Sequence, residues 1–299
     1  MIELACVGAL LMDMLGFTPR LPKHDEEVHV DGFTLSPGGS AANTAVAAAK
    51  LGIRAGFVGG VGEDQFGHML VKDLLEQGVD TSGVKFLNKP TGSYVAVTDS
   101  AGDRHMYAAT SAALQFSPKD IDPSYLAGAK IVHLADMPST ELLEAAAHHA
   151  GGLISINPGN LTIALGYNKV KPLLSNADIY ISTRAEAERL YQTNDLNSIV
   201  SALLGEGISK IALTSGSEGA LITDGNRTVR VPAFKVNIVD ATGAGDAFSA
   251  GFLYGIIKGL PLEECGRWGN AAAAMCISKL GARLNSTKPE IERLVRGSI

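Results

Sequence analysis

The chain has 299 residues, of which 46% are hydrophobic and 19% are charged, as in an ordinary globular protein. These proportions exclude intrinsic disorder, collagen and a long coiled coil. The net charge is −6, and no run of lysine or arginine supplies the basic surface that a nucleic-acid partner requires.

The three cysteines and the apolar segments indicate where in the cell the protein is located. Cys6, Cys265 and Cys276 lie far apart and form no CxxC pair, so we expect neither a disulfide framework nor a zinc site. No stretch approaches 18 uninterrupted apolar residues, and Glu3 and Asp13 fall where an export signal avoids charge. We therefore expect a cytoplasmic protein with no membrane partner.

The first 110 residues contain two kinds of predicted strand. Apolar runs, each followed by a helical pattern, predict a strand at 2–8, a helix at 40–51 with Ser40 as its N-cap, a strand at 56–60 and a helix at 65–77. More polar, alternating segments predict exposed strands at 28–35, 94–97 and 104–107. We expect these three to form a small β-sheet lid on insertions at about 15–37 and 84–110.

After Pro118 the sequence alternates between strands and helices. Short apolar strands are predicted at 131–134, 153–156, 179–181 and 211–214, with helices at 139–150, 184–191 and 196–205. A hairpin follows at 220–223 and 228–231, and the chain is mostly helical from residue 243 onward. This order predicts one α/β domain over 1–299, with a doubly wound, mainly parallel sheet flanked by helices.

Common nucleotide-binding motifs are absent. The sequence contains no GxxxxGK[ST], and the Gly-Val-Gly run at 60–62 lacks the third glycine of GxGxxG. The HRD and DFG motifs of protein kinases are missing as well. The chain therefore does not read as a P-loop enzyme, a dinucleotide-binding protein or a protein kinase.

The strongest local signal is Asp-Ala-Thr-Gly-Ala-Gly-Asp at 240–246, which leads into a helix. Gly243, Ala244 and Gly245 are small, so their amides can approach an anion at the positive end of the helix dipole. Asp246 is compatible with two roles of about equal weight on local physics. It either favours a helix N-terminus or acts as a base beside a phosphate-binding nest.

The second signal is Gly-Gly-Ser-Ala-Ala-Asn at 38–43. Gly38 and Gly39 permit close backbone approach, and the Asn43 amide can hydrogen-bond to neighbouring hydroxyls. Taken alone, this pattern is better explained as a tight turn followed by a small-residue packing face.

Together the two motifs resemble those of the ribokinase-like (PfkB-type) carbohydrate kinases, and their order and spacing fit over essentially the whole chain. The resemblance implies the ribokinase-like fold and transfer of the γ-phosphoryl of ATP to a sugar or nucleoside hydroxyl. By this resemblance Asp246 takes the hydroxyl proton, while the 243–245 amides stabilise the transferring group. Asp13, Gly38, Gly39 and Asn43 would bind the acceptor substrate.

The nucleotide and metal sites also follow from the resemblance. Thr214, Gly216 and Gly219 are similar to the family's TxGxxG loop at the ATP site, although alone they fit a strand–turn–strand. Asn270 lies on the helix that passes beside adenine in relatives, and a packing role fits it equally well.

The family's Asn-x-x-Glu motif appears here as Thr183-Arg184-Ala185-Glu186. Glu186 would bind Mg²⁺ through water, or it belongs to a solvated helix face. Asp240 and Thr242 match a monovalent cation site in relatives, with backbone oxygens expected from 279–286, which makes K⁺ activation a hypothesis.

The acceptor class remains open between three readings. Tyr107 is followed by Ala108 rather than by an arginine, which disfavours an acidic sugar, and Arg104 and Lys89 are unconvincing partners for a sugar phosphate. A neutral sugar as acceptor is favoured, a nucleoside kinase is the alternative, and a non-catalytic sensor is the third reading.

Family resemblance also suggests a homodimer that pairs through the lid. His133 and Asp136 fall near the expected substrate mouth and are read as structural.

Overall fold

A computed structural model describes residues 2–297, which fold around a nine-stranded sheet. Its spatial order is β13-β12-β11-β10-β9-β8-β1-β4-β5. The strands are β1 (Leu4–Val7), β4 (Ala55–Gly62), β5 (Asp80–Leu87), β8 (Ile131–Ala135), β9 (Leu153–Asn157), β10 (Ile179–Thr183), β11 (Lys210–Thr214), β12 (Ala220–Thr223) and β13 (Thr228–Val231). Only β12 and β13 run antiparallel to their neighbours, so the expected mainly parallel sheet is confirmed.

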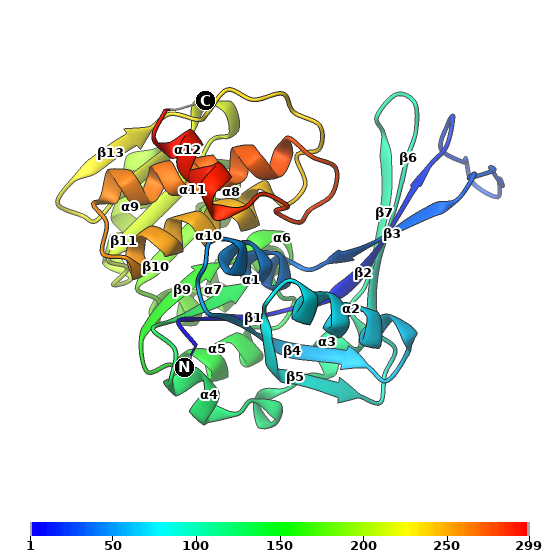
Figure 1. The fold of residues 1–299 in the computed structure, drawn as a ribbon, viewed down its shortest axis with the longest axis horizontal. Helices are drawn as coiled ribbons and strands as arrows, with labels where there is room; N and C mark the ends of the chain where they lie inside the picture. Colours follow the sequence, from blue (N-terminus) through cyan, green and yellow to red (C-terminus); the bar gives the residue numbers. More distant parts are fainter. Residues whose placement is uncertain (1, 298–299) are drawn as a thin grey trace.

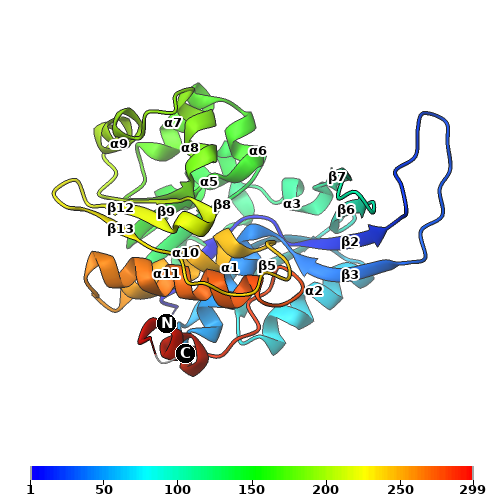
Figure 2. The ribbon, with the colours of Figure 1, turned by 90° about the horizontal axis from the view of Figure 1, so that it is seen from above.

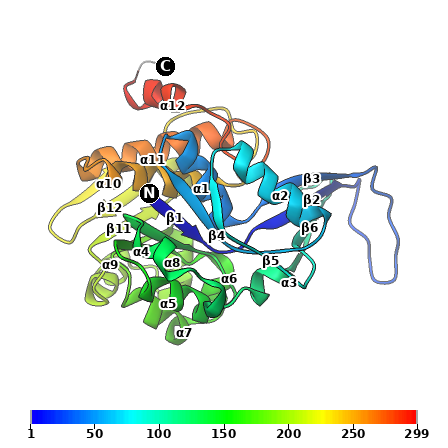
Figure 3. The same cartoon turned by 60° about the horizontal axis from the view of Figure 1, so that its bottom comes forward.

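Helices cover both faces of the sheet (Figures 1 and 3). One layer contains α1 (Ser40–Lys50), α2 (Gln65–Glu76), α10 (Ala244–Ile257), α11 (Leu262–Ile277) and α12 (Lys288–Val295). The opposite layer contains α3 (Ser111–Gln115), α4 (Pro123–Ala127), α5 (Thr140–His148), α6 (Gly159–Ala164), α7 (Tyr167–Leu174), α8 (Arg184–Tyr191) and α9 (Leu196–Gly205). The parallel strands are short apolar runs because both of their faces are buried.

Small residues bring the helices of the first layer unusually close together. The α1 segment 41–48 is completely buried and consists mostly of alanine. At Gly251 of α10, an added Cβ would lie 2.3 Å from the Trp268 carbonyl oxygen of α11. The helices α1 and α10 also pack against each other, where the Thr44 hydroxyl donates to the Asp246 carbonyl oxygen at 3.4 Å. Both sequence motifs run into the first turns of these two helices.

A second, four-stranded sheet in the order β3-β2-β6-β7 stands beside the main body (Figures 1 and 2). Its strands are β2 (Leu11–Phe17), β3 (Phe33–Gly38), β6 (Gly92–Thr98) and β7 (Arg104–Ala109). β2 pairs antiparallel with β3 and parallel with β6, so the sheet is mixed. Only three residues separate β1 from β2, which connects an interior strand of the main sheet directly to this second sheet.

Three details of the expected N-terminal half were wrong. The first lid strand is Phe33–Gly38 rather than 28–35, because the alternating charged residues before it pair with no other strand. Ser40 is the first residue of α1, and Gly39, with φ of 102°, occupies the cap position. Residues 84–87 belong to edge strand β5 of the main sheet; half-exposed edge strands read like lid strands in a sequence.

One further strand escaped the sequence analysis. Residues 11–17 form β2, which the sequence analysis did not predict, and Asp13 lies within this strand. Glycine and charge interrupt its apolar pattern, and it pairs in the second sheet rather than in the core.

Within residues 2–297 no helix has the length and apolar character needed to cross a membrane.

Candidate active site

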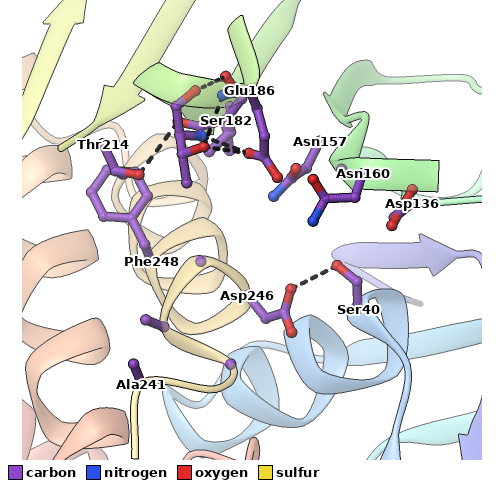
Figure 4. Close-up of a pocket in the computed structure, with 16 residues that line it drawn as sticks. Ser40, Asp136, Asn157, Asn160, Ser182, Glu186, Thr214, Ala241, Asp246 and Phe248 are labelled. Atoms are coloured by element: carbon purple, nitrogen blue, oxygen red, sulfur yellow. Dashed lines mark hydrogen bonds between the residues drawn. The ribbon is translucent and has the colours of Figure 1, made fainter. Parts of the chain in front are cut away.

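A cavity of about 380 Å³ opens at the carboxyl ends of the parallel strands, where open α/β sheets bind their ligands (Figure 4). Its lining residues come from α1, the segment after β8, the ends of β9, β10 and β11, the first turns of α6 and α8, and the loop that leads into α10 together with the first turns of that helix. They are Ser40, Asp136, Asn157, Gly159, Asn160, Ile181, Ser182, Thr183, Glu186, Thr214, Ala241, Gly243, Ala244, Gly245, Asp246 and Phe248. Three carboxylates, and neither lysine nor arginine, are among them.

The Asp246 carboxylate is held between the first turns of two helices. The Ser40 hydroxyl donates to its Oδ1 at 2.6 Å, and Asn43 Nδ2 donates to its Oδ2 at 2.8 Å. Burial raises the pKa of Asp246 to about 6, and these two hydrogen bonds partly oppose that shift. The arrangement fixes the position of a carboxylate whose pKa is about 6.

The loop before α10 presents backbone to the cavity. Gly243 has a φ of 77°, and an added Cβ would lie 2.1 Å from the Ala282 carbonyl oxygen, so only glycine fits there. Gly245 has no heavy atom within 4 Å of its would-be Cβ. Because the first amides of a helix have no partner inside it, this loop suits an anionic group.

Asp13 lies beside the glycine pair, on β2. An added Cβ at Gly38 would come within 2.3 Å of the Asp13 Oδ2 atom. The structure therefore brings Asp13 and Gly38 together, as the resemblance implied. Burial raises the pKa of Asp13 to about 6; the Arg283 guanidinium opposes this shift and the Asp246 charge adds to it.

Glu186 and Thr183 form a capping box at the start of α8. The Thr183 hydroxyl accepts from the Glu186 amide at 3.1 Å, and Glu186 Oε2 accepts from the Thr183 amide and hydroxyl at 2.8 and 2.9 Å. Threonine and asparagine are both favourable N-cap residues, so Thr183 can cap α8 at the position where the family motif has asparagine. Both residues line the cavity, so the cap also aims a carboxylate toward it.

Sequence reasoning set aside two polar groups that also line the cavity. Asp136 directly follows β8, and its Oδ1 accepts from the Leu161 and Thr162 amides at 2.9 Å each. Burial raises the pKa of Asp136 to about 6. Asn157, the last residue of β9, was not singled out in the sequence at all. Their position just after buried parallel strands was the available signal. His133, by contrast, is buried and paired with Ser155 at 3.0 Å.

Some predicted nucleotide residues lie outside this cavity. Thr214 lines the cavity, whereas Gly219 lines a separate small hollow of about 40 Å³. Gly216 lies in the turn that connects Thr214 to Gly219. The Asn270 side chain is buried and donates to the backbone oxygens of Val231 and Pro232 at 2.9 and 3.0 Å. These bonds tie α11 to the end of β13.

The expected cation-site residues are close together. The amide and hydroxyl of Thr242 donate to Asp240 Oδ1 at 3.0 and 2.7 Å. Asp240 Oδ2 accepts from the Gly281 amide at 3.0 Å, which joins this loop to the 279–286 segment. These hydrogen bonds lower the pKa of Asp240 against the opposing effect of burial.

Comparison with protein families matches residues 1–289 to the model described as pfkB family carbohydrate kinase. The chain belongs to this family. It is accordingly a sugar kinase, and kinases of this family use ATP and Mg²⁺. The Gly-rich cavity and its carboxylates fit a magnesium nucleotide, because oxygen donors suit Mg²⁺ and small residues suit phosphate.

Individual relatives agree with this membership. An ATP-dependent ribose-1-phosphate kinase of Halopiger xanaduensis is 31% identical over 95% of this chain and 94% of its own. Among solved structures, a ribokinase from Thermotoga maritima has a TM-score of 0.90 and 24% identity, covering 99% of this chain and 100% of its own. A putative ribokinase II from E. coli, in complex with ATP and Mg²⁺, has a TM-score of 0.86 and 23% identity over 99% and 100%. The two structures confirm the ribokinase-like fold.

The raised pKa of Asp246 predicts a pH-dependent stability. Between pH 3.8, the ordinary pKa of an aspartate, and about pH 6, the unfolded chain loses this proton while the folded chain keeps it. Folding thus becomes less favourable as the pH rises, by up to about 3 kcal/mol above pH 6. We expect Asp246→Asn to be more stable than wild type at pH 8, with the difference shrinking toward pH 4.5. Urea denaturation at both pH values measures it.

Asp122→Asn is the matched control, because hydrogen bonds from Ser124 lower the pKa of Asp122 instead. That substitution should have no stabilising effect at pH 8. Equal stability of Asp246→Asn and wild type at both pH values would contradict a raised pKa at Asp246.

Proposed function

We propose that this sugar kinase transfers the γ-phosphoryl of ATP to a hydroxyl of a neutral sugar, with Asp246 as the general base. The observation that carries the proposal is the position of Asp246. Its carboxylate lies in the cavity, next to the Gly243–Gly245 loop, with both oxygens held by Ser40 and Asn43. A base with a pKa of about 6 is ionised near pH 7 and still accepts a proton in the transition state.

The acceptor would lie between Asp13 and Asp246. Asn43 Oδ1 is buried and has no hydrogen-bond partner among the described residues, so it is available to a substrate hydroxyl. Asp13 supplies a second acceptor beside Gly38. A sugar with adjacent hydroxyls would thus donate to Asp13 and Asn43 while a third hydroxyl approaches Asp246, which removes its proton as the oxygen attacks phosphorus.

The charge of the transferring group needs stabilisation from the loop before α10. The amides of Ala244 and Gly245 begin a 14-residue helix, whose dipole adds to their attraction for an anion. Glu186 and Asp136 are the carboxylates that would hold Mg²⁺, with Glu186 acting through water. When bound, the ion neutralises phosphate charge in a cavity that offers no lysine or arginine.

The same absence of cations from the cavity lining supports an uncharged acceptor over a sugar phosphate. One relative is nevertheless named a ribose-1-phosphate kinase, so phosphorylated sugars belong among the candidates to be tested. Nucleosides form the alternative class, for which exposed aromatic residues of the second sheet, Phe17, Phe33 and Tyr107, could supply a base-binding surface.

The decisive measurement is ADP release with Mg²⁺ and ATP across neutral sugars, sugar phosphates and nucleosides. We expect a neutral sugar to stimulate turnover most, and Asp246→Asn to lower kcat by roughly 10³-fold or more while sugar binding persists. Preference for nucleosides would favour the alternative, and binding without turnover for any acceptor would indicate a sensor. Full activity of Asp246→Asn would remove it as the base.

We also propose that K⁺ activates the enzyme through the Asp240–Thr242 loop, which precedes Gly243 and is fastened to Gly281. An ordered cation there would fix the amides that meet the phosphoryl group. Replacing KCl by tetramethylammonium chloride at constant ionic strength should lower kcat several-fold. Unchanged kcat would exclude this role.

Finally, we propose a cytoplasmic homodimer that pairs through the second sheet. That sheet exposes Leu15, Phe17, Leu35 and Met106, and it ends in unpaired edges on β3 and β7. Exposed apolar residues and strand edges favour association. Sedimentation velocity should give a dimer for wild type and a monomer after Phe17→Lys combined with Leu35→Lys. A monomeric wild type at micromolar concentration would contradict this assembly.

A further inference from the structure

The buried side chain of Arg283 has no role in the function derived so far. It lies in the segment between α11 and α12 and is only 9% exposed. A buried guanidinium requires partners, since its charge is costly to remove from water. Those partners lead directly to the active site.

Arg283 contacts the back of the segment 37–43. Its Nη1 donates to the Ala42 carbonyl oxygen at 3.0 Å, and its Nε lies 3.5 Å from the Pro37 carbonyl oxygen. Gly38, which abuts Asp13, immediately follows Pro37. Ser40 and Asn43, which hold Asp246, flank Ala42. One side chain thus supports the backbone between both sets of site contacts.

The positive charge of Arg283 also acts on the two site carboxylates. It lowers the pKa of both Asp13 and Asp246 against the effect of burial, and the charge of Asp246 in turn raises the pKa of Asp13. Asp73 of α2 is the nearest carboxylate, with its Oδ2 3.6 Å from Nη2, yet neither atom has a hydrogen bond among the described residues. The guanidinium charge therefore acts on Asp73 and also on Asp246 and Asp13.

Other titratable groups face these carboxylates from the surrounding elements. Glu186 of α8 raises the pKa of Asp246, and the Asp13 charge raises that of Tyr94 on β6. The thiols of Cys6 and Cys276 have pKa values raised mainly by burial, so they remain neutral. None of these groups contributes a positive charge, which leaves Arg283 to compensate the repulsion between the two aspartates.

We propose that Arg283 is a positioning residue for phosphoryl transfer, which fixes the 37–43 segment from behind and keeps Asp13 and Asp246 ionised together. This inference rests on the proposed role of Asp246. Its charge effect becomes most important when the bound substrates exclude water, because electrostatic interactions strengthen as the local dielectric falls.

The test compares Arg283→Gln with Arg283→Lys in pH profiles of kcat and kcat/KM, using the best acceptor from the panel. Glutamine can still donate to the Ala42 oxygen but lacks the charge, whereas lysine keeps the charge. We expect the acid limb to move up by about one pH unit in the glutamine variant, so that activity falls about fivefold at pH 6 and much less at pH 8.5. The lysine variant should keep the wild-type limb.

Asp73→Asn is the control for loosened packing, because it removes the other charge beside Arg283 and lies outside the site. Its acid limb should not move upward. An equal loss at every pH in a folded glutamine variant, or an upward shift in Asp73→Asn, would overturn the proposal. If the glutamine variant fails to fold, the lysine variant decides, since an upward shift with the charge retained also contradicts it.

A readout without turnover separates this inference from the proposed function. ¹³C NMR titration of the aspartate carboxyls, assigned with Asp13→Asn and Asp246→Asn, follows both groups in the absence of substrate. Higher pKa values in Arg283→Gln would support the charge effect even if no acceptor is phosphorylated. Unchanged pKa values in that variant would overturn it even in an active kinase.

Discussion

The candidate active site depends on the contact between the first turns of α1 and α10. Ser40 and Asn43 reach Asp246 from more than 200 residues away in the sequence, at 2.6 and 2.8 Å. This contact requires little side-chain bulk on α1, which its buried alanines provide, whereas Gly251 and Gly255 of α10 face α11. The composition of α1 is thus a requirement of the site as much as of the core.

Three carboxylates in or near the site have pKa values of about 6: Asp13, Asp136 and Asp246. Asp136 and Asp246 line the cavity, and Asp13 lies beside Gly38. Burial is the largest cause in each case, and hydrogen bonds or a neighbouring charge keep each shift moderate. Burying carboxylates in this way lowers the free energy of unfolding relative to an apolar site. The two large clusters of buried side chains on either face of the sheet compensate for that loss.

Much of this arrangement could be predicted because short-range patterns encode it. Apolar runs followed by helical periodicity indicated the doubly wound sheet, and glycine-rich segments at strand ends marked both motifs. Such sequence patterns could not reveal contacts between residues that are far apart in the chain. Ser40 looked like a cap because serine favours caps, yet its hydroxyl is used by Asp246. Asp136 and Arg283 stand alone in the sequence, and only the tertiary fold shows what surrounds them.

The strand pairings also govern when the site can form during synthesis. β1 pairs with β4 and with β8, so both neighbours of this strand are available only after residue 135 has left the ribosome. The covering helix α10 follows more than 100 residues later, and Arg283 later still. The alanine-rich face of α1 therefore remains uncovered until α10 is synthesised, which makes nascent chains of this protein candidates for chaperone binding up to that point.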